Sequence, residues 1–130
     1  MPSETKITRL LSELTKLTSR GQVEWRMVDA PEALSRGTSD IYPVYLETEY
    51  KSQKIGLAQR RYQAFDGEND RFYWTEEISL LFFDTFDRVT WQSSNPRAAI
   101  YTLFDTAREQ VADIDGILKN LLGTEDDDEL

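Results

Sequence analysis

The sequence predicts an α+β fold: an N-terminal helix, a five-stranded antiparallel meander sheet and a long C-terminal helix, with both helices on one face of the sheet. The run Ile-Ser-Leu-Leu-Phe-Phe at 78–83 is short, aromatic-rich and followed by a polar turn, which is typical of a strand. Residues 42–50 and 53–65 are two strand-like runs separated by two residues, which indicates a hairpin. Apolar residues near both chain ends recur at spacings of three and four, which predicts helices.

The first helix is expected to follow Ser3, whose hydroxyl can cap it, with Glu4 in the first turn where a negative charge is favourable. Its apolar stripe consists of Ile7, Leu10, Leu11, Leu14 and Leu17. Arg20 and Gly21 end the helix, because glycine readily adopts the left-handed conformation that follows a helix C-terminus.

A short strand is expected next, because residues 22–28 alternate polar and apolar side chains. Val23, Trp25 and Met27 then share its buried face. Residues 29–40 carry Pro31, Gly37 and several small polar side chains, so they are expected to form a connection.

The strands 42–50 and 53–65 are expected to pair through a two-residue loop at 51–52. On one surface this register places Thr48 opposite Ile55, Leu46 opposite Leu57 and Val44 opposite Gln59. On the other surface Glu49 meets Lys54, a favourable cross-strand charge pair. Because Lys-Ser lacks the glycine or asparagine that such turns favour, a four-residue loop or a bulge is the alternative.

The fourth strand is expected over 72–83, after a polar loop at 66–70. With a turn at 85–86, the expected pairs across the last hairpin are Leu80 with Trp91 and Phe82 with Val89. Leu81 and Phe83 then project from the opposite surface, beyond the reach of helices on the first one. Two large apolar side chains there need a partner.

The last helix is expected to begin with Asn95 as cap and Pro96 in the first helical position. Its stripe runs through Ile100, Leu103, Phe104, Ala107, Val111, Ile114, Leu118 and Leu121. Gly123 ends it. The sequence therefore predicts a single α+β domain over 1–123 and a disordered acidic tail over 124–130.

Composition excludes several kinds of chemistry. A chain of 130 residues suits one domain with its own core. It has no histidine and no cysteine, which excludes a Ser-His-Asp triad, thiol catalysis, and imidazole or thiolate metal ligands. We therefore expect no cofactor and no catalytic residue.

The net charge of −9 is concentrated in the tail, where residues 125–129 supply five acidic side chains. The remaining body, with 15 basic and 19 acidic residues, has a net charge of −4. This balance disfavours nucleic acid and anionic membranes as partners. The sequence shows no signal-peptide pattern and no apolar run of membrane-spanning length, so we expect a cytoplasmic protein.

Pairs of carboxylates are the first candidates for a catalytic or magnesium site. They are Glu47 with Glu49, Glu76 with Glu77, and Asp84 with Asp87. Structural roles are favoured, because Lys54 can pair with Glu49 and aspartates are common turn residues. The loop 66–70 does not meet the calcium-loop pattern and is interpreted as a plain connection.

A cationic and aromatic surface is a second candidate, which would suit a single-stranded nucleic acid or a phosphorylated ligand. It would combine Arg60, Arg61 and Tyr62 with Tyr42, Tyr45 and Tyr73. The negative charge of the body and the nearby carboxylates argue against it, since the arginines can pair with those acids.

The leading functional hypothesis is a non-enzymatic protein-interaction module, acting as a homodimer or on another protein through the outer sheet face. The residues assigned to this contact are Tyr45, Tyr73, Leu81 and Phe83. The competing interpretation is that residues 29–40 or the tail cover this face within the monomer. Two other functions stay open: an acidic chaperone or inhibitor, of anti-defence or immunity type, for a basic partner, and a carboxylate-dependent metal enzyme.

A resemblance covers most of the chain. It rests on the leucine-striped first helix ending at Gly21, the strand Val23-Glu24-Trp25-Arg26, two hairpins, and the closing helix with Ala107-Arg108-Glu109-Gln110. These features resemble small uncharacterised acidic α+β proteins of prokaryotes or phages. In size and charge the chain is also similar to class I type III secretion chaperones and to small phage inhibitors of host defence. The resemblance implies no catalytic residue.

Overall fold

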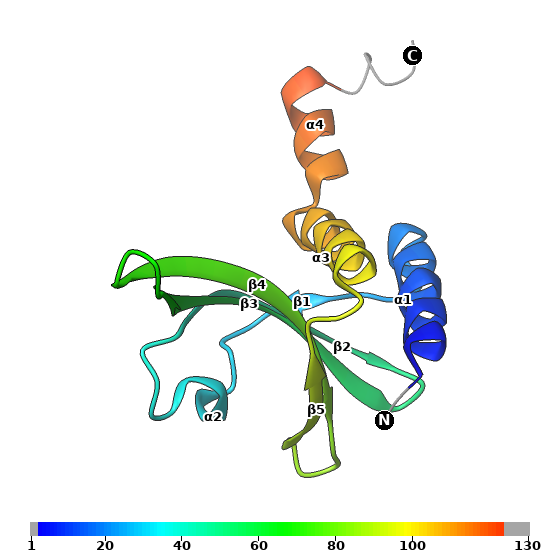
Figure 1. Cartoon of the computed structure of the whole chain (residues 1–130). Helices are drawn as coiled ribbons and strands as arrows, with labels where there is room; N and C mark the ends of the chain where they lie inside the picture. The colour runs from blue at the N-terminus through cyan, green and yellow to red at the C-terminus, as the bar shows by residue number, and fades with distance from the viewer. Residues whose placement is uncertain (1–2, 124–130) are drawn as a thin grey trace.

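The computed structural model describes residues 3–123 as an α+β protein with a five-stranded antiparallel sheet (Figure 1). Its elements are α1 (Glu4–Ser19), β1 (Arg26–Met27), α2 (Glu32–Ser35), β2 (Ile41–Tyr50), β3 (Gln53–Asp66), β4 (Arg71–Phe83), β5 (Val89–Ser93), α3 (Arg97–Ala112) and α4 (Ile114–Leu122). The strands lie in the order β1-β2-β3-β4-β5, which confirms the predicted meander. None of the described helices is long and apolar enough to cross a membrane.

Buried side chains of α1, α3 and the sheet form one hydrophobic cluster. It includes Ile7, Leu11 and Leu14 from α1, Ile100, Leu103, Phe104 and Ala107 from α3, and Leu46, Leu57, Ile78 and Leu80 from the sheet. Leu46, Leu57 and Leu80 are neighbours across β2, β3 and β4, so the sheet offers a continuous apolar row. The burial of each such leucine contributes roughly 1.5–3 kcal/mol to the stability of the fold. This cluster is the main core.

The Gln110 side chain ties α3 to the chain segment that follows α1. Its Oε1 accepts a hydrogen bond from the backbone N–H of Trp25 at 2.7 Å. Its Nε2 donates to the backbone carbonyls of Thr18 at 3.0 Å and Val23 at 2.7 Å. The indole N–H of Trp25 in turn donates to the Thr18 hydroxyl at 2.9 Å. These bonds satisfy polar groups that the apolar surroundings would otherwise leave unpaired.

The first strand is shorter than predicted. Only Arg26 and Met27 pair with β2, opposite Glu47 and Leu46. Val23 and Trp25 are buried as expected, but Met27 is exposed. The preceding residues do not join the ladder, because the Gln110 side chain takes the backbone groups of Val23 and Trp25.

The hairpin between β2 and β3 has the predicted register, with Glu49 opposite Lys54 and a two-residue loop. Lys51 and Ser52 both have positive φ, 51° and 64°, as a twist-matched two-residue turn requires. Neither residue type favours this conformation. The long pairing of the two strands therefore compensates for an unfavourable turn.

The last hairpin differs from the prediction. Its pairs are Phe82 with Trp91 and Phe83 with Val89, with an irregularity between them. The rings of Phe82 and Trp91 stack at 4.9 Å. The loop spans five residues, because the Asp84 carboxylate accepts hydrogen bonds from the backbone N–H groups of Phe86 and Arg88. This contact extends the turn beyond the predicted 85–86.

The C-terminal helical region is interrupted, which corrects the prediction of one continuous helix. Asp113 adopts a left-handed conformation, with φ 50° and ψ 53°, and separates α3 from α4. The predicted start is also displaced: Pro96 occupies the cap position, and no side chain caps the helix there. Figure 1 shows α4 projecting from the end of α3, away from the sheet. The predicted disordered tail lies outside the described residues.

Candidate interaction surface

Three of the four predicted contact residues are buried, which corrects the prediction of a docking surface on the outer sheet face. Leu81 is fully buried, and Phe83 and Tyr45 nearly so. They form a second hydrophobic cluster with Ala58, and Ala30, Leu34, Tyr42 and Val89 pack against it. The connection 29–40 covers them, because Ala30 and Leu34 supply apolar contacts from that segment. Only Tyr73 remains exposed.

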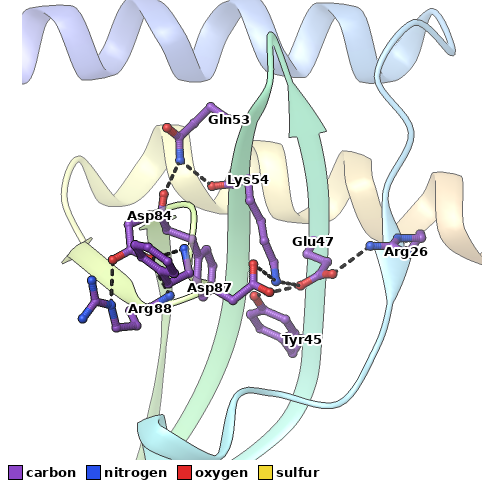
Figure 2. Close-up of polar contacts among 10 residues, drawn as sticks. Arg26, Tyr45, Glu47, Gln53, Lys54, Asp84, Asp87 and Arg88 are labelled. Atoms are coloured by element: carbon purple, nitrogen blue, oxygen red, sulfur yellow. Dashed lines mark hydrogen bonds and ion pairs between the residues drawn. The ribbon is translucent and has the colours of Figure 1, made fainter.

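A polar network borders this second cluster and is centred on Glu47 (Figure 2). Its buried carboxylate accepts a hydrogen bond from Arg26 at 2.8 Å and lies 3.4 Å from the Lys54 ammonium. Lys54 also lies 3.4 Å from Asp87. Lys54 therefore pairs with Glu47 and Asp87, whereas the sequence suggested Glu49. A buried carboxylate with two cationic neighbours is structurally compensated.

Tyr45 completes this network. Its hydroxyl donates to Glu47 Oε2 at 3.3 Å. Burial, followed by the Glu47 charge and this hydrogen bond, raises the pKa of the Tyr45 hydroxyl well above its ordinary value, so Tyr45 stays a proton donor. Gly56 makes the arrangement possible, because a Cβ there would lie 2.6 Å from the Tyr45 hydroxyl and 3.1 Å from the Phe83 ring.

Three more of the predicted carboxylates also have structural partners. Glu76 pairs with Arg61 at 3.6 Å, Glu77 with Arg60 at 3.1 Å, and Asp84 with Arg88 at 2.8 Å. The predicted polar loop is held by Asp66, which accepts hydrogen bonds from Glu68 and Asn69. Among residues 3–123, no group of three carboxylate side chains could hold a metal ion.

The predicted cationic surface is largely neutralised at Arg60. Its guanidinium donates to Asp40 at 2.7 Å and to Glu77 at 3.1 Å, and it stacks over the Tyr62 ring at 4.0 Å. Tyr42 and Tyr45 belong to the second cluster. The arginines and tyrosines therefore do not form the single open surface that the sequence suggested.

A first uncovered apolar surface lies on α4. Ile114, Ile117, Leu118, Leu121 and Leu122 are all exposed, from 40% at Ile114 to 77% at Leu121. Their spacing places them on one side of the helix, whereas Asp115, Lys119 and Asn120 lie on the other. Three of the five, Ile114, Leu118 and Leu121, belong to the predicted stripe of the last helix. We call these five side chains the α4 stripe.

A second uncovered apolar surface lies at the far end of the β3–β4 hairpin. Here residues 62–66 and 71–75 extend past the last pair between β2 and β3, Ile41 with Arg61. We call this two-stranded part the arm. Phe65, Phe72 and Trp74 are each about half exposed or more, and the Phe65 and Phe72 rings meet edge to face at 5.2 Å.

These three aromatic residues lie on the same sheet face as the main core. Side chains alternate along a strand, so Phe65 lies on the face of Leu57, and Phe72 and Trp74 lie on that of Leu80. In Figure 1 the arm curves away from α3, and α4 points in another direction. The main core therefore continues into an apolar strip that no described helix covers.

Two shallow hollows flank the base of α4. One, of about 370 Å³, is lined by residues that include Met27, Val111 and Ile114. The other, of about 300 Å³, lies on the side of α1 and is lined by residues that include Gln110 and Asp113. Both are open and carry acidic side chains at their rims, namely Asp105, Glu109 and Asp115. The first hollow extends the apolar surface of the α4 stripe toward the body, and the second is mainly polar.

No protein-family model, no curated protein and no solved structure matches the chain. The resemblance to small prokaryotic or phage proteins and to secretion chaperones stays a prediction.

Proposed function

We propose that the protein is a non-enzymatic protein-interaction module that binds through the α4 stripe and the arm. One observation carries the proposal: a helix of nine residues exposes five large apolar side chains, all on one side. Contiguous apolar surface of this kind is rare on monomeric soluble proteins and usually marks a contact with another molecule. The contact surface proposed here replaces the outer sheet face around Leu81.

The fold supports this assignment. In the proposed architecture α1 and α3 cover one face of the sheet and the connection 29–40 covers the other, which leaves the α4 stripe and the arm without a cover. Apart from Glu49, the paired carboxylates that the sequence suggests have structural partners, as Glu47 does with Arg26 and Lys54. The exposed apolar side chains of the α4 stripe and the arm have no such partners among residues 3–123.

A pair of matched variants tests the proposal. Leu121→Asp places a charge in the α4 stripe, whereas Asn120→Asp places the same charge on the polar side of the same helix turn. Each protein serves as bait in an extract of the source cells, with circular dichroism as the control for folding. We expect the wild type and Asn120→Asp to retain the same proteins and Leu121→Asp to lose them. Identical retention by all three baits would contradict the proposal.

A second candidate is the capture of a basic segment of another protein. The observation that favours it is the excess of acidic side chains at the base of α4, where Asp105, Glu109 and Asp115 border the two hollows and Arg108 is the one basic residue among the described lining residues. Residues 125–129 add five acidic side chains after the helix. Binding of this kind weakens as salt rises, because salt screens the attraction. Binding that is unchanged between low and high salt, and after deletion of 124–130, would exclude this candidate.

A further inference from the structure

We infer that the occupant of these surfaces is a second copy of this chain, with the α4 stripe of each copy lying on the arm of its partner. The inference rests on the proposed function and names its partner. It starts from complementarity: the chain has one uncovered amphipathic helix and one uncovered apolar ribbon, and each is the kind of surface that covers the other. In Figure 1 the two diverge, so α4 does not cover the arm of its own chain.

The arm repeats the chemistry of the main core. In that core, α1 and α3 place leucine and isoleucine side chains on the sheet face that carries Leu57 and Leu80. The arm continues this face with Phe65, Phe72 and Trp74. The α4 stripe offers leucine and isoleucine side chains at the same helical spacing. A partner's α4 on the arm would extend the helical layer along the sheet.

The exposed area is sufficient for a stable dimer. With roughly 200 Å² for a fully exposed large apolar residue, the exposed fractions of the α4 stripe and the three arm residues give on the order of 800 Å² per copy. Stable protein interfaces bury about this area on each partner. Neither surface reaches it alone, so both must take part.

The exchange can close into a two-fold pair. Each copy gives one helix and receives one, so a two-fold arrangement uses both surfaces of both copies. The pairing brings together two chains of net charge −9. Their mutual repulsion is screened by salt, so self-association strengthens as salt rises. Capture of a basic partner has the opposite salt dependence.

Analytical ultracentrifugation of the full chain tests the inference, with Leu121→Asp for the α4 stripe, Phe72→Asp for the arm and Asn120→Asp as control. We expect the wild type and Asn120→Asp to be dimers at micromolar concentration. The dissociation constants of Leu121→Asp and Phe72→Asp should each rise at least 100-fold. Circular dichroism and thermal melting confirm that each variant is folded.

Mixing the two variants distinguishes an exchange from a pairing of like surfaces. In a mixed dimer, the intact α4 of Phe72→Asp lies on the intact arm of Leu121→Asp, so one of the two contacts is restored. We expect the mixture to associate more tightly than either variant alone. If α4 pairs with α4, mixing restores nothing, and that result would overturn the inference.

Crosslinking identifies the contact directly, because the chain has no cysteine of its own. Leu118→Cys and Phe72→Cys chains of different mass are mixed and treated with a short thiol-specific crosslinker. A product that joins the two different chains supports the exchange, and a product that joins two Leu118→Cys chains only would contradict it. A wild type that is monomeric throughout also overturns the inference. The proposed function then still stands if the Leu121→Asp bait loses its partners, and fails if it does not.

Discussion

The carboxylate of Asp113 accepts a hydrogen bond from the backbone N–H of Gly116 at 3.3 Å, and this contact begins α4 in a new direction. Asp113 itself is left-handed, a conformation that aspartate tolerates better than most residues. A Cβ at position 116 would collide with the Asp113 carboxylate, so the glycine is part of the same cap. The direction of the α4 stripe thus depends on two residues.

Replacement of Asp113 tests this dependence. Asp113→Ala removes the cap and disfavours positive φ, so we expect α3 and α4 to merge into one helix and self-association to weaken at least tenfold. Asp113→Gly also removes the cap but permits the left-handed backbone, and it should stay close to the wild type. Carbon chemical shifts around residue 113 report the backbone change. A left-handed residue 113 in the alanine variant would refute this explanation.

The hydrogen bonds of the Gln110 side chain lead to a prediction about stability. Gln110→Leu keeps a similar volume but leaves the backbone N–H of Trp25 and the carbonyl of Val23 without their partner. We expect a loss of about 2–4 kcal/mol in the free energy of unfolding. Glu109→Leu, at the exposed neighbouring position, should change it by less than about 0.5 kcal/mol. If Gln110→Leu and Glu109→Leu lower the free energy of unfolding in urea by the same amount, the three hydrogen bonds of Gln110 contribute little to stability.

The raised pKa of the Tyr45 hydroxyl leads to a prediction about how stability depends on pH. Burial and the neighbouring Glu47 carboxylate raise the pKa of its hydroxyl in the folded protein above that in the unfolded chain. The folded state therefore retains a proton that the unfolded state loses, and this contribution to stability is complete below about pH 10 and declines above it. We expect the wild type to lose stability more steeply than Tyr45→Phe between about pH 9.5 and 11. If the free energies of unfolding of the two proteins fall in parallel over this pH range, the pKa of Tyr45 is not raised in the folded protein.

The burial of Leu81 predicts that its truncation affects folding. Leu81→Ala should lower the free energy of unfolding by about 2–5 kcal/mol, since it opens a cavity in the second cluster. Phe86→Ala removes a larger side chain, but one that is 77% exposed, and should cost less than about 1 kcal/mol. Urea unfolding measures both. A Leu81→Ala protein as stable as the wild type would mean that the 29–40 segment does not hold this cluster.

The sheet could be predicted because its signals are local. The strands β2 and β3 alternate on both faces, so only one register brings Leu46 opposite Leu57 and Glu49 opposite Lys54. The cover over Leu81 could not be predicted in the same way. Alternation shows that a face is apolar, but it does not show whether a connection such as 29–40 packs on it.

The α4 stripe was misassigned for a related reason. Apolar periodicity continues through Asp113 without interruption, and periodicity alone does not distinguish an apolar side that faces the core from one that stays exposed. A signal was nevertheless present. Asp113 precedes a new apolar run that has Asp115 in its first turn and Gly116 at the capped position, which is a pattern of helix initiation.

Sedimentation equilibrium of the wild type beside Leu121→Asp and Asn120→Asp tests the central claim most directly. The two variants differ only in which side of α4 carries the added charge, and circular dichroism checks that each is folded. We predict a dimer for the wild type and for Asn120→Asp, and a monomer for Leu121→Asp at the same concentration. One mass for all three proteins, whether monomer or dimer, would contradict the assignment of the α4 stripe as the contact between copies.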